Sequence, residues 1–167
     1  RMVSKAGTSA PVIRLATSDD ARAIAALSRT EIEQALPWRW TPPRVQRAVA
    51  DARTNVCVAV QRTSLLGFGI MVYADDTAHL SLLAVNPEAR RQGVGTALLQ
   101  WLEQVAGVAG IERVQLEARR SNVAALAFYS RHGYRQTGLV AGMYLGVEDG
   151  VRLEKPLGLA ASLNTPP

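Results

Sequence analysis

A glycine-rich turn behind two arginines is the segment whose residue types most clearly suggest chemistry. Residues 88–99 are EARRQGVGTALL, so Arg90 and Arg91 precede Gly93 and Gly95, and an apolar helical pattern follows. The first turn of a helix carries unpaired N–H groups and about half a unit of positive charge. Glycine has no Cβ, so an anion can approach its backbone closely. The turn therefore predicts a binding site for phosphate or pyrophosphate.

Two common phosphate-binding motifs are excluded at this turn. No Gly-Lys-Ser/Thr sequence is present, which rules out a Walker-type nucleotide loop. A dinucleotide fingerprint would need a third glycine at the position of Leu98. A Gly-x-Gly pair is weak by itself, so on this turn alone an ordinary helix start without a ligand remains open.

A second group of polar side chains follows in residues 116–138, LEARRSNVAALAFYSRHGYRQTG. Glu117 lies at the end of an expected strand, Asn122 in the first turn of the next expected helix, and Tyr129 near the end of that helix. A carboxylate can accept a proton and a tyrosine hydroxyl can donate one, so Glu117 and Tyr129 could act as base and acid. Each also has a structural interpretation: Glu117 as a solvated strand residue, and Tyr129 as a core aromatic residue.

Taken together and in this order, the two segments resemble the motifs of the GNAT superfamily of acyl-CoA-dependent N-acyltransferases. The pattern R-x-x-G-x-G at residues 90–95 is similar to the coenzyme A signature of that family. The run E-x-R-x-x-N-x-x-A-x-x-F-Y-x-x-x-G-Y at residues 117–134 resembles the ribosomal-protein alanine N-acetyltransferase branch. The resemblance is strong over residues 77–138 and extends from 12 to 157.

The resemblance implies acetyl-CoA as co-substrate and no metal. The pantetheine arm would lie along the strand before the glycine turn, and the pyrophosphate would lie on the backbone amides of the turn, beside both arginines. An asparagine and an alanine of the following helix would contact the arm, and a tyrosine would lie near the sulfur. The implied binding residues are Leu83, Ala84, Val85, Arg90, Arg91, Gln92, Gly93, Val94, Gly95, Thr96, Asn122, Ala125 and Tyr129.

The resemblance also assigns catalytic roles. An amine attacks a thioester only when it is neutral, so a base is needed at pH 7. Glu117 matches the family's general base, which usually works through water, and Tyr129 matches the acid that protonates the leaving thiolate. The amide of Leu83 would stabilise negative charge on the thioester carbonyl. His79, which shares a strand face with Ser81, stays open as an alternative base, since other branches place it on that strand.

In this family the acceptor groove usually lies between the loop that joins the first two helices and the hairpin of the last two strands. Here these segments are residues 36–41 and 138–150. Trp38, Trp40 and Tyr144 are accordingly expected to contact the acceptor. An alternative is that the tryptophans only pack the two helices together.

The elements that must position these residues alternate irregularly between strands and helices. Apolar periodicity, capping residues and turn signals predict the order β-α-α-β-β-β-α-β-α-β-β. Such an order favours a mixed, mostly antiparallel α/β sheet of about seven strands with helices on both faces, the GNAT fold, over a doubly wound sheet. The expected strands are 12–15, 55–62, 65–75, 77–85, 111–118, 134–140 and 151–157, and the expected helices are 18–35, 41–53, 93–107 and 121–132, the last with Ser121 as N-cap and Gly133 after its end.

Length and composition fit one ordinary domain. The chain has 167 residues, of which 48% are hydrophobic and 20% charged. We expect a single domain over 11–158, with tails at 1–10 and 159–167. Its one cysteine, Cys57, excludes an internal disulfide and a Cys/His zinc cluster, and it is expected to be a small core residue in a cytoplasmic protein. No apolar run approaches the ~18 residues that cross a bilayer, so no membrane partner is expected.

The charge balance is basic. There are 19 Lys and Arg residues against 14 Asp and Glu, a net charge of +5, and almost all of the basic residues are arginine. They are spread singly except at 90–91 and 119–120, without the basic runs and interleaved aromatics typical of nucleic-acid binders, so no nucleic-acid partner is expected. Arg39, Arg44 and Arg47 near the acceptor groove suggest an acidic acceptor, although a solvated helix face would also explain them.

These patterns predict an enzyme that transfers an acetyl group from acetyl-CoA directly to a primary amine, without a covalent enzyme intermediate. The acceptor would be a protein N-terminal α-amine or a small-molecule amine. The alternative is a non-catalytic acyl-CoA-binding or sensing module, which would bind coenzyme A without turnover. A homodimer is possible for this family, and His132 is expected to be structural, at a helix end that favours positive charge.

Overall fold

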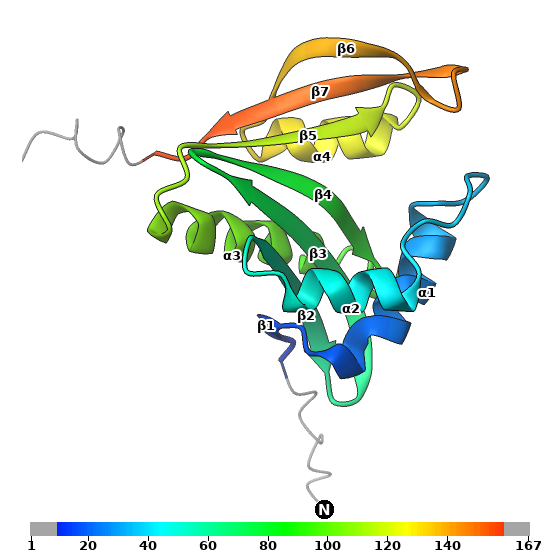
Figure 1. The fold of residues 1–167 in the computed structure, drawn as a ribbon, viewed down its shortest axis with the longest axis vertical. Helices are drawn as coiled ribbons and strands as arrows, with labels where there is room; N and C mark the ends of the chain where they lie inside the picture. Colours follow the sequence, from blue (N-terminus) through cyan, green and yellow to red (C-terminus); the bar gives the residue numbers. More distant parts are fainter. Residues whose placement is uncertain (1–9, 159–167) are drawn as a thin grey trace, which may run out of the picture.

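The computed structural model describes residues 10–158 (Figure 1). The expected tails lie outside this range except for Ala10. The order of helices and strands is the predicted one, with two short 3-10 turns added at Ser18–Asp20 and Pro87–Ala89. The elements are β1 (Val12–Leu15), α1 (Ala21–Glu31), α2 (Pro42–Ala50), β2 (Thr54–Gln61), β3 (Ser64–Ala74), β4 (Thr77–Val85), α3 (Val94–Val108), β5 (Arg113–Arg119), α4 (Val123–Arg131), β6 (Arg135–Tyr144) and β7 (Glu148–Pro156).

One seven-stranded sheet in the order β1-β2-β3-β4-β5-β7-β6 organises the molecule. Every neighbouring pair is antiparallel except β4 and β5, which are parallel. Helices α1 and α2 cover one face through Ile24 and Val45, and α3 covers the other through Leu98 and Leu102 (Figure 1). Helix α4 packs on the same face as α3. The predicted mixed, mostly antiparallel sheet with helices on both faces is confirmed.

The sheet opens between its two parallel strands. Register pairs join β4 and β5 only from Thr77–His79 to Arg113–Gln115, after which the strands diverge (Figure 1). The divergence coincides with a β-bulge at Ser81, the residue left over where β3 pairs with Leu80 and then with Leu82 of β4. A bulge bends its strand and increases the local twist, so β4 leaves β5 at this point and exposes its backbone edge.

The bulge also exchanges the faces of β4. Leu80 packs into the core under α3, whereas Leu82 packs into the core under α1 and α2. Side chains along a regular strand alternate with a period of two, so these residues would otherwise share a face. As a result, Leu83 faces the α3 side, whereas His79 and Ser81 face the α1–α2 side.

The helix expected over 18–35 is wrong at both ends. It begins with the 3-10 turn and stops at Glu31, because the following segment satisfies its backbone in another way. The buried carboxylate of Glu33 accepts hydrogen bonds from the backbone N–H groups of Arg39 at 2.7 Å and Trp40 at 3.1 Å. An internal carboxylate therefore fixes the loop between α1 and α2.

The expected N-cap of α4, Ser121, is also wrong. The cap is Asn122, whose side-chain oxygen accepts a hydrogen bond from the Ala125 N–H at 3.1 Å. Ser121 instead donates both its hydroxyl and its N–H to Glu148, and these bonds hold the pKa of that carboxyl below its usual value. Gly133, with φ +91°, follows the end of the helix as predicted.

Candidate active site

The gap between β4 and β5 forms a cavity of about 340 Å³, which we call the sheet cavity. Its walls are Leu80–Leu83 of β4 and Leu116–Arg119 of β5. On the α3 side it reaches Asn122 and Tyr129 of α4, and on the opposite side it reaches the end of α1. The cavity therefore joins the two faces of the sheet.

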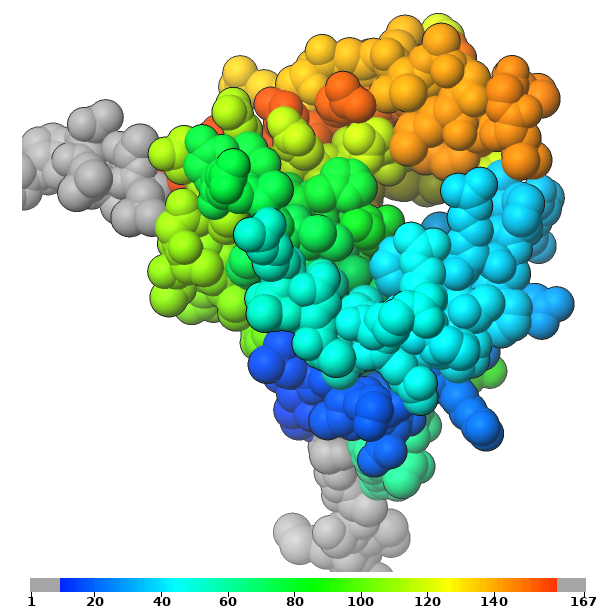
Figure 2. Space-filling view, in the orientation of Figure 1, coloured from blue at the N-terminus to red at the C-terminus, as the bar shows by residue number. Residues whose placement is uncertain are grey.

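A second cavity of about 350 Å³, the loop cavity, lies on the α1–α2 side. It is bordered by the α1–α2 loop, including Arg39 and Trp40, and by Met143 and Tyr144 of the β6–β7 hairpin. Figure 2 shows the hollow between this loop and the hairpin. The two cavities share several lining residues, among them Glu117.

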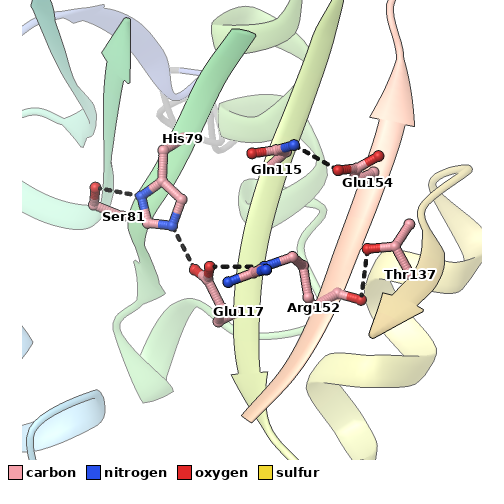
Figure 3. Close-up of polar contacts among 7 residues, drawn as sticks. All are labelled: His79, Ser81, Gln115, Glu117, Thr137, Arg152 and Glu154. Atoms are coloured by element: carbon pink, nitrogen blue, oxygen red, sulfur yellow. Dashed lines mark hydrogen bonds and ion pairs between the residues drawn. The ribbon is translucent and has the colours of Figure 1, made fainter. Parts of the chain in front are cut away.

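The Glu117 carboxylate is held by His79 and Arg152. Its Oε2 lies 2.5 Å from His79 Nε2, and its Oε1 accepts a hydrogen bond of 3.4 Å from Arg152 Nε (Figure 3). Leu116 and Ala118 on either side pack into the α3 core, so Glu117 points to the α1–α2 face as the strand alternation predicts. Its side chain is only 14% exposed, so the two partners fix its orientation.

His79 connects Glu117 to Ser81. A carboxylate only accepts hydrogen bonds, so Nε2–H donates to Glu117, and Nδ1 lies 3.0 Å from the Ser81 hydroxyl (Figure 3). The His79 side chain is 44% exposed. His79 therefore links the mostly buried carboxylate to a side chain that reaches solvent. Sequence reasoning placed His79 and Ser81 on one face but offered His79 only as an alternative base, not as the partner of Glu117.

Tyr129 borders the sheet cavity from the α3 side of the sheet. Its ring makes edge contacts with Phe128 and Tyr134 at centroid distances of 5.2 and 5.5 Å. Burial raises the pKa of Tyr129 well above its usual value, so the hydroxyl keeps its proton at neutral and mildly alkaline pH. Glu117 and Tyr129 approach the cavity from opposite sides of the sheet, which separates a candidate base from a candidate acid.

The glycine turn leads directly into α3. Gly93 is the N-cap residue with φ +76°, in the left-handed region that favours glycine. No side chain caps the helix, so its first N–H groups are left to water or a ligand. A Cβ on Gly95 would make only ordinary contacts with Phe128 and Val85 at 3.5 Å, so the fold itself does not demand glycine there. Such an uncapped helix start suits an anion.

The arginines before this turn differ in their surroundings. Arg90 Nη2 donates to Glu31 Oε2 at 2.7 Å, so the guanidinium is directed to the end of α1. Arg91 has φ +63° and shapes the turn. The hydroxyl of Thr96 lies 2.9 Å from His132 Nε2, and His132 Nδ1 donates to the Phe128 carbonyl at 2.7 Å. These contacts agree with the structural role expected for His132.

The remaining residues expected to contact the donor lie where the sheet separates. Leu83 and Ala125 border the sheet cavity, as does Asn122. Because the Asn122 oxygen caps α4, only its Nδ2 amide is left to contact a ligand. Ala84 is buried under α1 and α2, and Val85 packs against the α3 core, so from these two only the backbone is placed to contact a ligand.

The structure separates the two tryptophans. Trp40 borders the loop cavity beside Tyr144. Trp38 lies instead in a different hollow beside α1, with the guanidinium of Arg29 4.8 Å from its ring. The structure therefore does not bring Trp38 together with the other two acceptor candidates. Tyr144 lies 4.9 Å from the Arg119 guanidinium, and burial raises the pKa of its hydroxyl.

Sequence reasoning missed two residues of the site. Arg152 contacts Glu117 because the β5–β7 register places them opposite each other, a long-range pairing that no local pattern reveals. Glu31 borders the sheet cavity and pairs with Arg90 across the molecule. Its only sequence signal is a carboxylate at a helix end, where the helix dipole disfavours negative charge.

The cysteine, the possible metal ligands and the helix lengths also bear on the expectations from the sequence. Cys57 is buried as expected, and burial raises the pKa of its thiol to about 12, so it is not a reactive nucleophile. Between residues 10 and 158, no three His, Cys, Asp or Glu side chains come together in a way that could hold a metal ion. Within the same range no helix is both long and apolar enough to span a membrane.

Comparisons of the sequence and of the structure with known proteins all find acetyltransferases. The model of the acetyltransferase (GNAT) family matches residues 21–134. The ribosomal protein bS18-alanine N-acetyltransferase of Escherichia coli is 32% identical over 102 residues, 59% of this chain and 69% of that protein. An N-alpha-acetyltransferase of Sulfolobus acidocaldarius is 28% identical over 154 residues, 87% of this chain and 92% of that protein. The crystal structure of the Escherichia coli ribosomal-protein-S18-alanine enzyme aligns with a TM-score of 0.77 and 26% identity, over 89% of this chain and 94% of that one.

Proposed function

Since the chain belongs to the GNAT acetyltransferase family and is an N-acetyltransferase that transfers an acetyl group from acetyl-CoA to an amine, we propose that its acceptor is the N-terminal α-amine of a protein or peptide. Glu117 serves as the general base and Tyr129 as the general acid. The non-catalytic coenzyme A-binding alternative is not favoured, because the matching relatives are named as N-acetyltransferases.

One observation carries this proposal: Glu117 borders both cavities. The sheet cavity extends toward α4 and Tyr129, whereas the loop cavity extends toward Trp40 and the β6–β7 hairpin. A donor in the first and an acceptor in the second would meet beside one oriented carboxylate. This arrangement suits direct transfer between two bound substrates, and the buried Cys57 offers no competing nucleophile.

The residues at the α3 end fit coenzyme A. Its pyrophosphate would lie at the uncapped start of α3, where Gly93 leaves the backbone open and the helix dipole favours negative charge. The pantetheine arm would lie along Leu83–Val85, the part of β4 that β5 leaves without a partner. When bound, acetyl-CoA supplies an activated acetyl group on a thioester.

The chain's residues then have the following tasks. Glu117 takes the proton of the ammonium group, directly or through water, so that the neutral amine can attack. His79 keeps the carboxylate directed into the cavity by donating its Nε2–H to it, and the carboxylate later gives up its proton to water. The Leu83 amide stabilises the charge that develops on the carbonyl oxygen. Tyr129, which its raised pKa keeps protonated near neutrality, donates its proton to the departing sulfur, and the proton that the acylated nitrogen then loses restores the hydroxyl.

The acceptor assignment is supported by the position of the loop cavity between two segments of chain. A peptide can extend from the reacting amine along Trp40 and Tyr144, which offer aromatic faces and a hydroxyl. The names of the two relatives, one acting on an alanine of a ribosomal protein and one on an α-amine, favour the same class of acceptor.

A thiol-release assay tests this proposal. The enzyme is given acetyl-CoA with peptides that have a free α-amine, with the same peptides blocked at the N-terminus but carrying an internal lysine, and with polyamines and amino acids. We expect free thiol only with unblocked peptides, and mass spectrometry should place the acetyl group on the first residue. A higher kcat/KM for any small amine than for every peptide would overturn the acceptor assignment.

A further inference from the structure

We propose that the loop cavity selects peptides whose first residues carry acidic side chains after the reacting α-amine, with Arg39 and Arg44 as the specificity-determining residues. The inference rests on the proposed peptide acceptor and names its chemistry more closely. It follows from which charges in the cavity already have partners and which do not.

The carboxylates of the loop cavity are already engaged. Glu33 accepts hydrogen bonds from the Ser28 hydroxyl at 2.9 Å and from two backbone N–H groups of the α1–α2 loop. Glu117 contacts His79 and Arg152. Neither carboxylate is left to attract a basic acceptor side chain, and Glu117 is required near the reacting amine itself.

The guanidinium groups of the cavity lack such partners. Arg39 and Arg44 border the loop cavity, and neither forms an ion pair with a carboxylate anywhere in the described part of the chain. Arg119, which borders the sheet cavity, differs because Glu148 lies 3.7 Å from it. The ionisable lining of the loop cavity thus consists of two satisfied carboxylates, the Tyr144 hydroxyl and two unpaired cations.

The fold holds the Arg44 guanidinium and the backbone of Arg39 in place. The Arg44 guanidinium lies 4.0 Å from the centre of the Trp40 ring, a stacking contact that leaves its N–H edges free to bind a carboxylate. The backbone of Arg39 is anchored by Glu33 at 2.7 Å. A pre-positioned guanidinium such as that of Arg44 loses little entropy when it binds, so a carboxylate on the peptide gains more from it than from a mobile surface arginine.

The test compares peptides that share a free N-terminal residue and differ only at positions two to four, which are Asp/Glu, Gln/Asn or Lys/Arg. We expect kcat/KM to follow the order acidic, neutral, basic, with about fivefold between acidic and neutral, and the gap should narrow as salt is raised. Arg39→Gln and Arg44→Gln should each lower kcat/KM severalfold more for the acidic peptide than for the neutral peptide.

Two further variants separate charge from structure. Arg47→Gln removes the same charge from an exposed position of α2 that does not border the cavity, and it should leave the preference intact. The double variant Arg39→Glu/Arg44→Glu should reverse the preference toward basic peptides, an effect that misfolding cannot produce. Equal rates for acidic and neutral peptides would overturn the inferred acidic preference and leave the proposed acceptor class standing. The same would follow if Arg47→Gln weakened the preference as much as Arg39→Gln or Arg44→Gln does. Failure to acetylate any peptide would overturn the proposed acceptor class itself.

Discussion

Glu117 Oε2 and His79 Nε2 lie 2.5 Å apart and join β5 to β4 at the place where the two strands separate. The bulge at Ser81 opens the sheet immediately beyond this contact. The bulge therefore opens the cavity for the donor directly beside the histidine that contacts the carboxylate we propose as the base.

The His79 contact gives the first prediction. His79→Ala removes a hydrogen bond to a charged group, which is typically worth about 1.5–3 kcal/mol, so kcat should fall about ten- to a hundredfold. His79→Gln keeps an N–H donor at similar reach and should retain most of the activity, with KM for acetyl-CoA unchanged in both variants. Steady-state kinetics check this. Equal losses in the two variants would contradict a role through hydrogen bonding.

The second prediction concerns pH. Burial raises the pKa of Tyr129, so its hydroxyl stays protonated up to at least about pH 10 and cannot cause a decline in kcat below that pH. Tyr129→Phe keeps the ring contacts with Phe128 and Tyr134 but should lower kcat about a hundredfold at every pH. The check is a pH–rate profile from pH 6 to 10. An alkaline decline in the wild type that disappears in Tyr129→Phe would contradict the raised pKa, and near-wild-type kcat of Tyr129→Phe would contradict the role of Tyr129 as the acid.

The third prediction concerns the ion pair of Arg90 with Glu31. If Arg90 binds the pyrophosphate, Glu31 competes for its guanidinium. Glu31→Gln should then tighten coenzyme A binding by about two- to fivefold, because the Arg90 side chain of the pair is 61% exposed and ion pairs in contact with solvent are weak. Titration calorimetry measures this, and Glu88→Gln, which removes an exposed carboxylate close to the same turn, is the control. A similar gain in both variants would show a general charge effect instead of a specific one.

The fourth prediction compares two glycines of the α3 region that both have open space where a Cβ would be placed. Gly93 has φ +76°, so Gly93→Ala should destabilise the protein by about 1–2 kcal/mol. Gly107 lies inside the helix without positive φ, and Gly107→Ala should stabilise it by about 0.5 kcal/mol. Thermal unfolding should shift by about 2–4 °C per kcal/mol, in opposite directions. Shifts of the same sign would contradict the left-handed N-cap.

Much of the fold follows from local sequence patterns. Alternation in residues 113–118 correctly predicts which face of β5 carries Glu117, because side chains along a strand alternate whatever the partner strand is. The helix start at Gly93 and the helix end at Gly133 were likewise predicted, and both glycines have a positive φ that few other residues adopt.

The parts that could not be predicted depend on distant segments. The bulge at Ser81 arises from the register between β3 and β4, and the Glu117–Arg152 contact from that between β5 and β7. The early end of α1 depends on Glu33 reaching the backbone six residues further along the chain. The same loop places Trp40 in the loop cavity and turns Trp38 away from it.

The measurement that tests the central claim most directly is the kcat of Glu117→Gln on an unblocked peptide, with Glu154→Gln on neighbouring β7 as the matched control. Glu154 bonds to Gln115 and borders neither cavity. We predict that Glu117→Gln lowers kcat about a hundred- to ten-thousandfold with coenzyme A affinity unchanged, while Glu154→Gln stays near wild type. Near-wild-type turnover by Glu117→Gln would contradict its role as the base.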